Sequence, residues 1–123
     1  MLLPQSKFPL LDKYKEKFEI TPRTIFAYDN EIYSDYDLPY HLIVHEETHH
    51  KQQNACGLDN WVEKYLNDPE FRLWQEVEAY KKQLSVIKDR EARFHIKLEC
   101  IKNLSSDLYG NIVTKDEAKK LLE

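Results

Sequence analysis

The sequence predicts a single, mostly α-helical domain of the α+β class that spans residues 1–123, with a short β-hairpin ahead of its main helices. The length of 123 residues suits one domain built around one core. Only 2 glycines occur in the chain, and this scarcity disfavours turn-rich all-β sandwiches and barrels. Apolar residues make up 41% of the chain against 33% charged residues, which is enough apolar material to exclude the disordered class.

The segment from Thr24 to Tyr33 is expected to form the β-hairpin. The runs on either side of Asp29 and Asn30 are rich in β-branched and aromatic residues, which favour strands. Asp29 and Asn30 themselves are residue types that tolerate the positive φ angles of a two-residue hairpin turn. The residues before this segment have only a weak helical pattern, and no function is assigned to them.

A central helix is expected to begin near Leu38 or Pro39 and to end near Cys56. Proline fits the first turn of a helix, where its missing N–H group is not needed. Gly57 suits the left-handed conformation that ends a helix. The run 42–44 is apolar on every side of this helix, so we expect the helix to be buried in the centre of the domain.

Further helices are expected along the rest of the chain. Asp68 and Pro69 are favoured residue types at the N-cap and the first position of a helix, and the four residues from Thr114 have the form of a capping box. The expected elements are a short helix around Trp61–Leu66, a long helix from Asp68 with a core-facing stripe of Leu73, Val77, Tyr80, Leu84 and Ile87, a helix from Ala92 to Leu104 with a stripe of Phe94, Leu98 and Ile101, and a terminal helix that ends at Leu122.

Charge and hydropathy exclude several classes of partner. The chain carries 18 basic and 22 acidic residues, and no cluster of Lys or Arg alternates with aromatic residues, so no nucleic acid partner is expected. No apolar run approaches the roughly 18 residues that span a bilayer, and the amino terminus lacks the apolar segment of a secretion signal. We therefore expect no membrane partner and a cytoplasmic location. Cys56 and Cys100 lack the spacing of a metal site and are expected to be free thiols.

The chemistry of the chain is concentrated in an HExxH sequence, residues 45–49, inside the expected central helix. Residues four apart on an α-helix differ by about 40° of rotation and about 6 Å of rise, so His45 and His49 project from one face and can share one zinc ion. Glu46 lies about 100° around the helix. Its carboxylate is expected beside the metal, where it can act as a general base toward a zinc-activated water.

A catalytic zinc ion takes a third protein ligand, and two glutamates of the next long helix are candidates. Measured from the centre of the core-facing stripe at about 100° per residue, Glu76 lies about 60° away and Glu78 about 140° away. Glu76 therefore borders the buried face and is favoured as the third ligand, while Glu78 is the alternative.

Other polar side chains have less defined roles. His41 could pair with His45, but Leu42 would then stand where a carboxylate is needed, so His41 is assigned a structural place or the rim of the site. Gln52 either lines the cleft or is buried and hydrogen-bonded. An oxyanion could be stabilised by one of three tyrosines or, as an outside candidate, by His95. The three tyrosines are Tyr65, Tyr80 and Tyr109.

These residues resemble the gluzincins, zinc peptidases in which an HExxH helix is completed by a glutamate on a second helix, often in the form Glu-x-x-Ala. Residues 76–79 match that form. The surroundings, over about residues 25–83, look like those of small HExxH proteins of phages and bacteria. One position differs, because several gluzincins have an Asp four residues after the ligand glutamate to orient the first histidine. Tyr80 stands there, so the orienting partner of His45 is unassigned.

The resemblance implies a zincin-like minimal domain that hydrolyses a peptide or protein substrate. It also implies a strand ahead of the active-site helix that binds an extended peptide by β-addition, a role for the expected hairpin. For a phage-encoded chain the location would be the host cytoplasm. Two other classes stay open at this point: a non-catalytic protein that keeps zinc for stability or for binding a partner, and a metal-free helical interaction domain.

Overall fold

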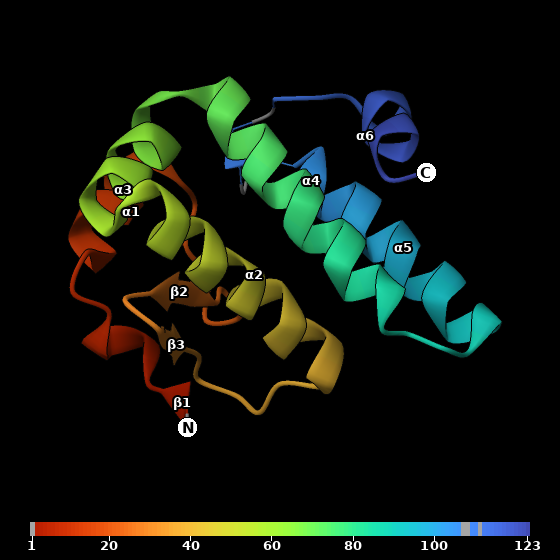
Figure 1. The fold of residues 1–123 in the computed structure, drawn as a ribbon, viewed down its shortest axis with the longest axis horizontal. Coiled ribbons are helices and arrows are strands. Elements are labelled where there is room, and N and C mark those ends of the chain that lie inside the picture. Colours follow the sequence, from red (N-terminus) through yellow and green to blue (C-terminus); the bar gives the residue numbers. More distant parts are fainter. Residues whose placement is uncertain (1, 107–108, 111) are drawn as a thin grey trace.

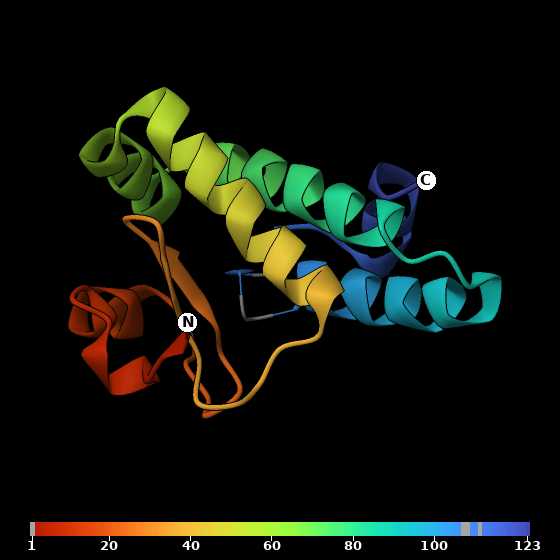
Figure 2. The ribbon, with the colours of Figure 1, turned by 60° about the horizontal axis from the view of Figure 1, so that its bottom comes forward.

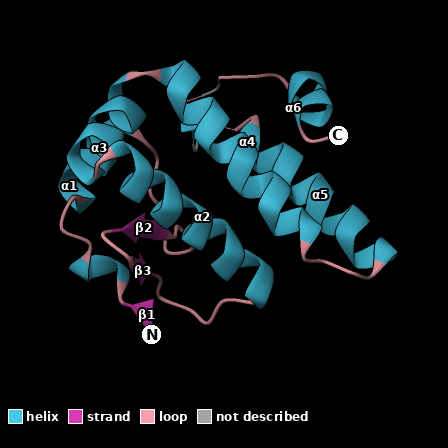
Figure 3. Ribbon diagram, in the orientation of Figure 1, coloured by secondary structure: helices cyan, strands magenta, loops and turns pink. Residues whose placement is uncertain are grey.

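The computed structural model describes residues 2–106, 109–110 and 112–123, and in them most residues are helical and one small sheet lies at one side (Figures 1 and 3). The predicted α+β, mostly α class is therefore confirmed. In this part of the chain, no helix is both long enough and apolar enough to cross a bilayer.

The predicted hairpin is present, and a third strand extends it. Strand β2 covers Phe26–Tyr28 and pairs antiparallel with β3, Glu31–Tyr33. Asp29 and Asn30 have φ angles of 51° and 65°, as a two-residue turn requires. Strand β1, Leu2–Leu3, pairs parallel with β3, so β2 is an edge strand. A strand of two residues has no readable periodicity, which is why the sequence did not indicate it.

The helices follow the predicted order with adjusted ends. A 3-10 turn at Gln5–Lys7 precedes α1 (Leu11–Lys17), α2 (Tyr40–Cys56), α3 (Leu58–Asn67), α4 (Pro69–Ser85), α5 (Arg90–Leu104) and α6 (Lys115–Leu121). Gly57, at φ 92°, ends α2 and also caps α3, so α3 begins earlier than predicted. The Asp68 cap of α4 and the capping box of α6 are confirmed. Both cysteines are free thiols.

Two hydrophobic clusters lie on either side of the long helix α2 (Figures 1 and 2). The first, called here the amino-terminal cluster, joins α1, the hairpin and α3 through Phe8, Tyr14, Phe18, Phe26, Tyr33, Trp61, Val62 and Tyr65. The second, called the carboxy-terminal cluster, joins α4, α5 and α6 through Leu73, Val77, Tyr80, Leu84, Cys100, Ile101, Leu104, Ala118 and Leu122. Helix α2 contacts α3, α4 and β2, so it connects the two clusters.

The buried face of α2 is polar, which differs from the prediction. Its apolar run 42–44 is only half-buried. The buried residues of the helix are His45, Glu46, Thr48, His49, Gln52 and Gln53. Burial of such groups is stable only where hydrogen bonds compensate for the lost water. Among the described residues, every side-chain polar atom that is completely shielded from solvent has a hydrogen-bond partner. The central position of α2 therefore serves a polar site and not an apolar core.

The stripe predicted for α5 is only partly buried. Ile101 lies in the carboxy-terminal cluster, but Phe94 and Leu98 are 59% and 50% exposed. These residues do share one side of the helix, as their spacing predicts. The amino-terminal half of that side is therefore left largely open to solvent, and this part of the prediction was wrong.

Candidate metal centre

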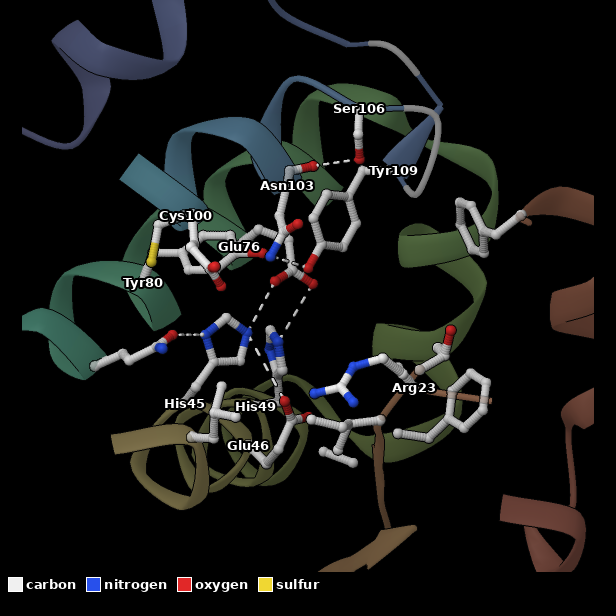
Figure 4. Close-up of a pocket in the computed structure, with 18 of the residues that line it drawn as sticks. Arg23, His45, Glu46, His49, Glu76, Tyr80, Cys100, Asn103, Ser106 and Tyr109 are labelled. Carbon is white, nitrogen blue, oxygen red and sulfur yellow. Dashed lines mark hydrogen bonds and ion pairs between the residues drawn. The ribbon is translucent and has the colours of Figure 1, made fainter. Parts of the chain in front are cut away.

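Helices α2 and α4 bring three potential metal ligands together in the interior (Figure 4). His45 Nε2 lies 3.1 Å from Glu76 Oε1, and His49 Nε2 lies 3.3 Å from Glu76 Oε2. One ligand atom from each of the three residues lies within 4.8 Å of the others. The side chains are almost completely buried, at 4%, 5% and 2% exposure for His45, His49 and Glu76.

The spacing of these residues is compatible with a metal ion. Bonds of about 2.0–2.2 Å in a tetrahedron place neighbouring ligand atoms about 3.4 Å apart. The distances of 3.1 and 3.3 Å run from the two histidines to different oxygens of Glu76, so the three side chains converge on one point without yet having the spacing of a single coordination sphere. Two imidazoles and one carboxylate also form a donor set that zinc accepts in catalytic sites. With these three residues as ligands, a four-coordinate zinc ion would have one position left for water or substrate.

The other ring nitrogen of each histidine is held by a glutamine. Nδ1 of His45 is 2.9 Å from Oε1 of Gln83, and Nδ1 of His49 is 2.8 Å from Oε1 of Gln52. An amide oxygen can only accept a hydrogen bond, so both Nδ1 atoms carry the proton and donate it. Once Nε2 of each ring gives up its own proton, its lone pair is directed at the centre, as metal ligation requires.

The two glutamines are themselves fixed from outside the centre. Nε2 of Gln83 donates to Nδ1 of His41 over 2.9 Å. Nε2 of Gln52 donates to Oε1 of Glu78 over 2.7 Å. Two roles were predicted for Gln52, and the structure shows the second: it is buried and hydrogen-bonded. Glu78 is exposed and acts through Gln52, so the geometry favours Glu76 over Glu78 as the third ligand.

Gln83 is the site residue that sequence reasoning missed. Gln83 has the orienting role expected for an Asp at position 80, where this chain has Tyr80. The signal for it was available, because Gln83 follows Glu76 by seven residues, which is two turns along the same face of α4. A glutamine at that spacing is not a recognised motif, so only the contact with His45 identifies it.

Glu76 is surrounded by groups that stabilise its charge. Tyr65 donates a hydrogen bond of 2.5 Å to Oε2 of Glu76. Burial by itself would raise the pKa of Glu76 and lower that of His49. Their mutual attraction outweighs burial, so the pKa of Glu76 falls well below its usual range and the pKa of His49 rises to about 9. In the metal-free chain a His49–Glu76 ion pair therefore occupies the place of the metal.

Glu46 lies beside the three potential ligands and takes no part in the short contacts that join them. Its Oε2 atom is 3.9 Å from Nε2 of His45, and no described residue forms a hydrogen bond with its carboxylate. The residue is 6% exposed, and burial raises the pKa of its carboxyl group. A raised pKa makes a carboxylate a better proton acceptor, so this arrangement suits a general base.

A cavity of about 710 Å³ opens onto this centre and is lined by Glu46 and by the three potential ligands. The edge strand β2 and the loop before it form one wall through residues 23–27, and α5 forms another. Tyr80 and Tyr109 line the cavity with their hydroxyl groups 2.7 Å apart. Figure 4 shows Arg23, another residue that sequence reasoning missed, pointing into this space.

The remaining histidines lie away from the centre. His50 donates from Nε2 to the carbonyl of Glu31 over 2.8 Å and so ties α2 to the hairpin. His95 is exposed on α5 and does not line the cavity. Its suggested role in stabilising an oxyanion was therefore wrong, whereas Tyr65, Tyr80 and Tyr109 all line the cavity.

Comparisons with known proteins add no relative. No family model, no curated protein and no solved structure matches the chain. A functional conclusion for this protein therefore depends on the chemistry of its own residues.

Proposed function

We propose that the chain is a small zinc-dependent metallopeptidase of the gluzincin type. The observation that carries the proposal is the place of Glu46, whose buried carboxylate lies 3.9 Å from Nε2 of His45 and outside the group of three ligand atoms. A carboxylate in a purely structural metal site would bind the metal or turn to solvent. Glu46 does neither and faces a cavity large enough for several residues of a peptide.

His45, His49 and Glu76 would hold the zinc ion. When bound, zinc lowers the pKa of a coordinated water to about 7 and polarises a carbonyl group. Glu46 accepts a proton from the water that attacks the peptide carbonyl, and then delivers that proton to the amine that leaves. Gln83 and Gln52 keep the two imidazole rings oriented during this cycle.

The edge strand β2 offers a place for an extended substrate. Tyr28 and Glu31 flank the two-residue turn, so the N–H and C=O groups of Ala27 point away from β3. The carbonyl of Ala27 already accepts a hydrogen bond of 2.8 Å from Gln53. Strand addition would therefore use the part of the edge around Ile25, which lines the cavity.

The first test is metal content. The purified chain, supplied with zinc and dialysed, is expected to retain one equivalent, and His49→Ala is expected to retain none. Glu46→Gln is expected to keep the zinc and to lower peptide hydrolysis by at least about a hundredfold. Glu47→Gln is the matched control, because Glu47 is the exposed neighbour of Glu46 and should leave activity unchanged.

The outcomes separate the proposal from its alternatives. A chain that binds zinc through His49 but hydrolyses no peptide in a broad library would be a non-catalytic, zinc-stabilised protein. A chain that binds no metal would be the helical interaction domain. Equal turnover by the wild type and by Glu46→Gln would refute the assignment of the general base.

A further inference from the structure

Arg23 is held in a rigid loop at the wall of the cavity. The loop joins α1 to β2, and two hydrogen bonds between Thr21 and Thr24 close it. The N–H of Thr24 donates to the carbonyl of Thr21 over 3.0 Å, and the N–H of Thr21 donates to the hydroxyl of Thr24 over 3.0 Å. The N–H of Arg23 donates to the hydroxyl of Thr21 over 3.2 Å. Gln5 donates to the carbonyls of Thr21 and Thr24 over 2.8 and 3.0 Å. The backbone of Arg23 therefore has little freedom.

The side chain of Arg23 is also ordered before any ligand arrives. Its guanidinium carbon lies 4.7 Å from the centre of the Tyr36 ring, a stacking contact typical of arginine. The Tyr36 hydroxyl donates to the carbonyl of Arg23 over 3.1 Å, so the two residues hold each other. Figure 4 shows the guanidinium directed into the cavity that Glu46 also lines. A ligand would meet an exposed guanidinium that is already placed against the Tyr36 ring.

No described carboxylate forms an ion pair with Arg23. The ion pairs of the described residues all join a histidine to a glutamate. Burial is the main cause of the raised pKa of the Tyr36 hydroxyl. The charge of Arg23 lowers that pKa and the charge of Glu46 raises it, so both charges lie near Tyr36. Glu46 nevertheless forms no ion pair with Arg23 within 4.0 Å, and its proposed role requires a free carboxylate. The guanidinium therefore has donors available for a group from outside the chain.

We propose that Arg23 binds a carboxylate of the substrate and so directs the enzyme to acidic peptides. A guanidinium can bind a carboxylate through two parallel hydrogen bonds. The carboxylate belongs either to an acidic side chain near the bond that is cut or to a free carboxyl terminus. The inference rests on the proposed function, because it takes the cavity to be the substrate site.

The test measures binding and not turnover. The metal-free full chain is titrated in a calorimeter with a matched pair of alanine peptides blocked at both ends. One peptide has a central glutamate and the other has a glutamine at the same position. A second pair is an unblocked carboxyl-terminal alanine peptide and its amide. At least one carboxylate peptide is expected to bind about tenfold more tightly than its neutral partner. Metal-free protein is used because a carboxylate would otherwise bind zinc directly, and its fold is checked by circular dichroism.

Variants assign the effect to Arg23. Arg23→Gln is expected to abolish the preference for the carboxylate, and Arg23→Lys to retain part of it. Arg93→Gln, an exposed arginine outside the cavity, is the control that should keep the preference. The glutamate pair and the terminal pair show which source of carboxylate is recognised. If the metal-free chain is unfolded, zinc-loaded Glu46→Gln is compared with zinc-loaded Glu46→Gln/Arg23→Gln. Direct binding of a carboxylate to zinc is common to both chains, so the difference between them measures the effect of Arg23.

Three results would overturn the inference: equal affinity for both members of each pair, no measurable binding of any peptide, or a preference that survives Arg23→Gln. Failure of the proposed function is recognised separately. A chain that shows the Arg23-dependent preference but cleaves no peptide would refute catalysis and retain the carboxylate site.

Discussion

Each proposed histidine ligand is oriented by a neutral amide. Gln83 holds His45 and Gln52 holds His49, whereas a carboxylate in either place would add negative charge and raise the basicity of the imidazole. Among the three proposed ligands, Glu76 alone is anionic. A zinc ion here would therefore keep a net positive charge, which favours both the acidity of a bound water and the attraction of a substrate carbonyl.

Gln83→Ala is expected to weaken zinc binding by about tenfold or more, because His45 loses the group that fixes its ring. Competition with a chromogenic chelator measures the change. Gln83→Glu keeps an oxygen acceptor and should restore most of the affinity. Gln5→Ala is the control, since the side chain of Gln5 forms its hydrogen bonds with the carbonyls of Thr21 and Thr24 and not with the candidate metal centre. Unchanged zinc affinity in Gln83→Ala would show that His45 needs no orienting partner.

The choice of third ligand is tested by a matched pair of glutamate variants. Glu76→Gln removes the charge that lies 3.1 and 3.3 Å from the two histidines, and zinc retention is expected to be lost. Glu78→Gln keeps an acceptor for Gln52 and should retain one equivalent. Zinc content by mass spectrometry of the native protein gives the result, and loss in Glu78→Gln alone would contradict the assignment.

Helices α2 and α4 are held in place by different interactions. Helix α4 has a regular apolar stripe that enters the carboxy-terminal cluster, and Asp68 caps it with hydrogen bonds of 3.1 Å to the N–H groups of Glu70 and Phe71. Helix α2 buries polar residues, so its position depends on specific hydrogen bonds. Gln53 illustrates this, since it is 1% exposed and bonds both Ala27 and Asp29 of the hairpin.

Asp68→Ala is expected to lower the free energy of unfolding by about 1 kcal/mol, because two N–H groups of the first turn of α4 lose their acceptor. Zinc stoichiometry should not change, since Glu76 lies two turns further along. Urea unfolding followed by circular dichroism measures the loss. Asp37→Ala, at an exposed position outside the helices, provides the control, and an equal effect there would argue against the cap.

In the whole molecule, the candidate metal centre lies between the two hydrophobic clusters. His45 and His49 belong to α2, Glu76 belongs to α4, and Tyr65 of α3 donates to Glu76 from the amino-terminal cluster. A bound ion would therefore link segments whose apolar contacts are otherwise divided between two clusters. Zinc should act on the stability of the whole chain and not only on the site.

Chelation is expected to lower the thermal midpoint of the zinc-loaded chain. A ligand that binds only the folded state adds about 4 kcal/mol at a free concentration about 1,000 times its Kd, which corresponds to about 10 °C or more for a chain of this size. Thermal scans with and without a chelator measure the shift. His49→Ala should melt at one temperature under both conditions, and a wild-type midpoint insensitive to the chelator would exclude the linking role.

Local geometry made part of the site readable from the sequence. The 3.6-residue period of α2 places His45 and His49 on one face with Glu46 beside them. The same period of α4 places Glu76 on its buried side. The caps at Asp68 and Thr114 and the turn at Asp29 are equally local, because a single residue type satisfies backbone groups a few positions away.

Contacts between distant segments were decided by the tertiary structure. Gln83 meets His45 across 38 positions, and Gln52 meets Glu78 across 26; neither pair has a local spacing that predicts it. Arg23 lines the cavity together with residues of α2, α4 and α5, all far from it along the chain. The sequence alone determined which groups can do metal chemistry on each helix. Packing decided which of them meet, since hydrogen bonds to buried polar groups form only where two elements come within about 3 Å of each other.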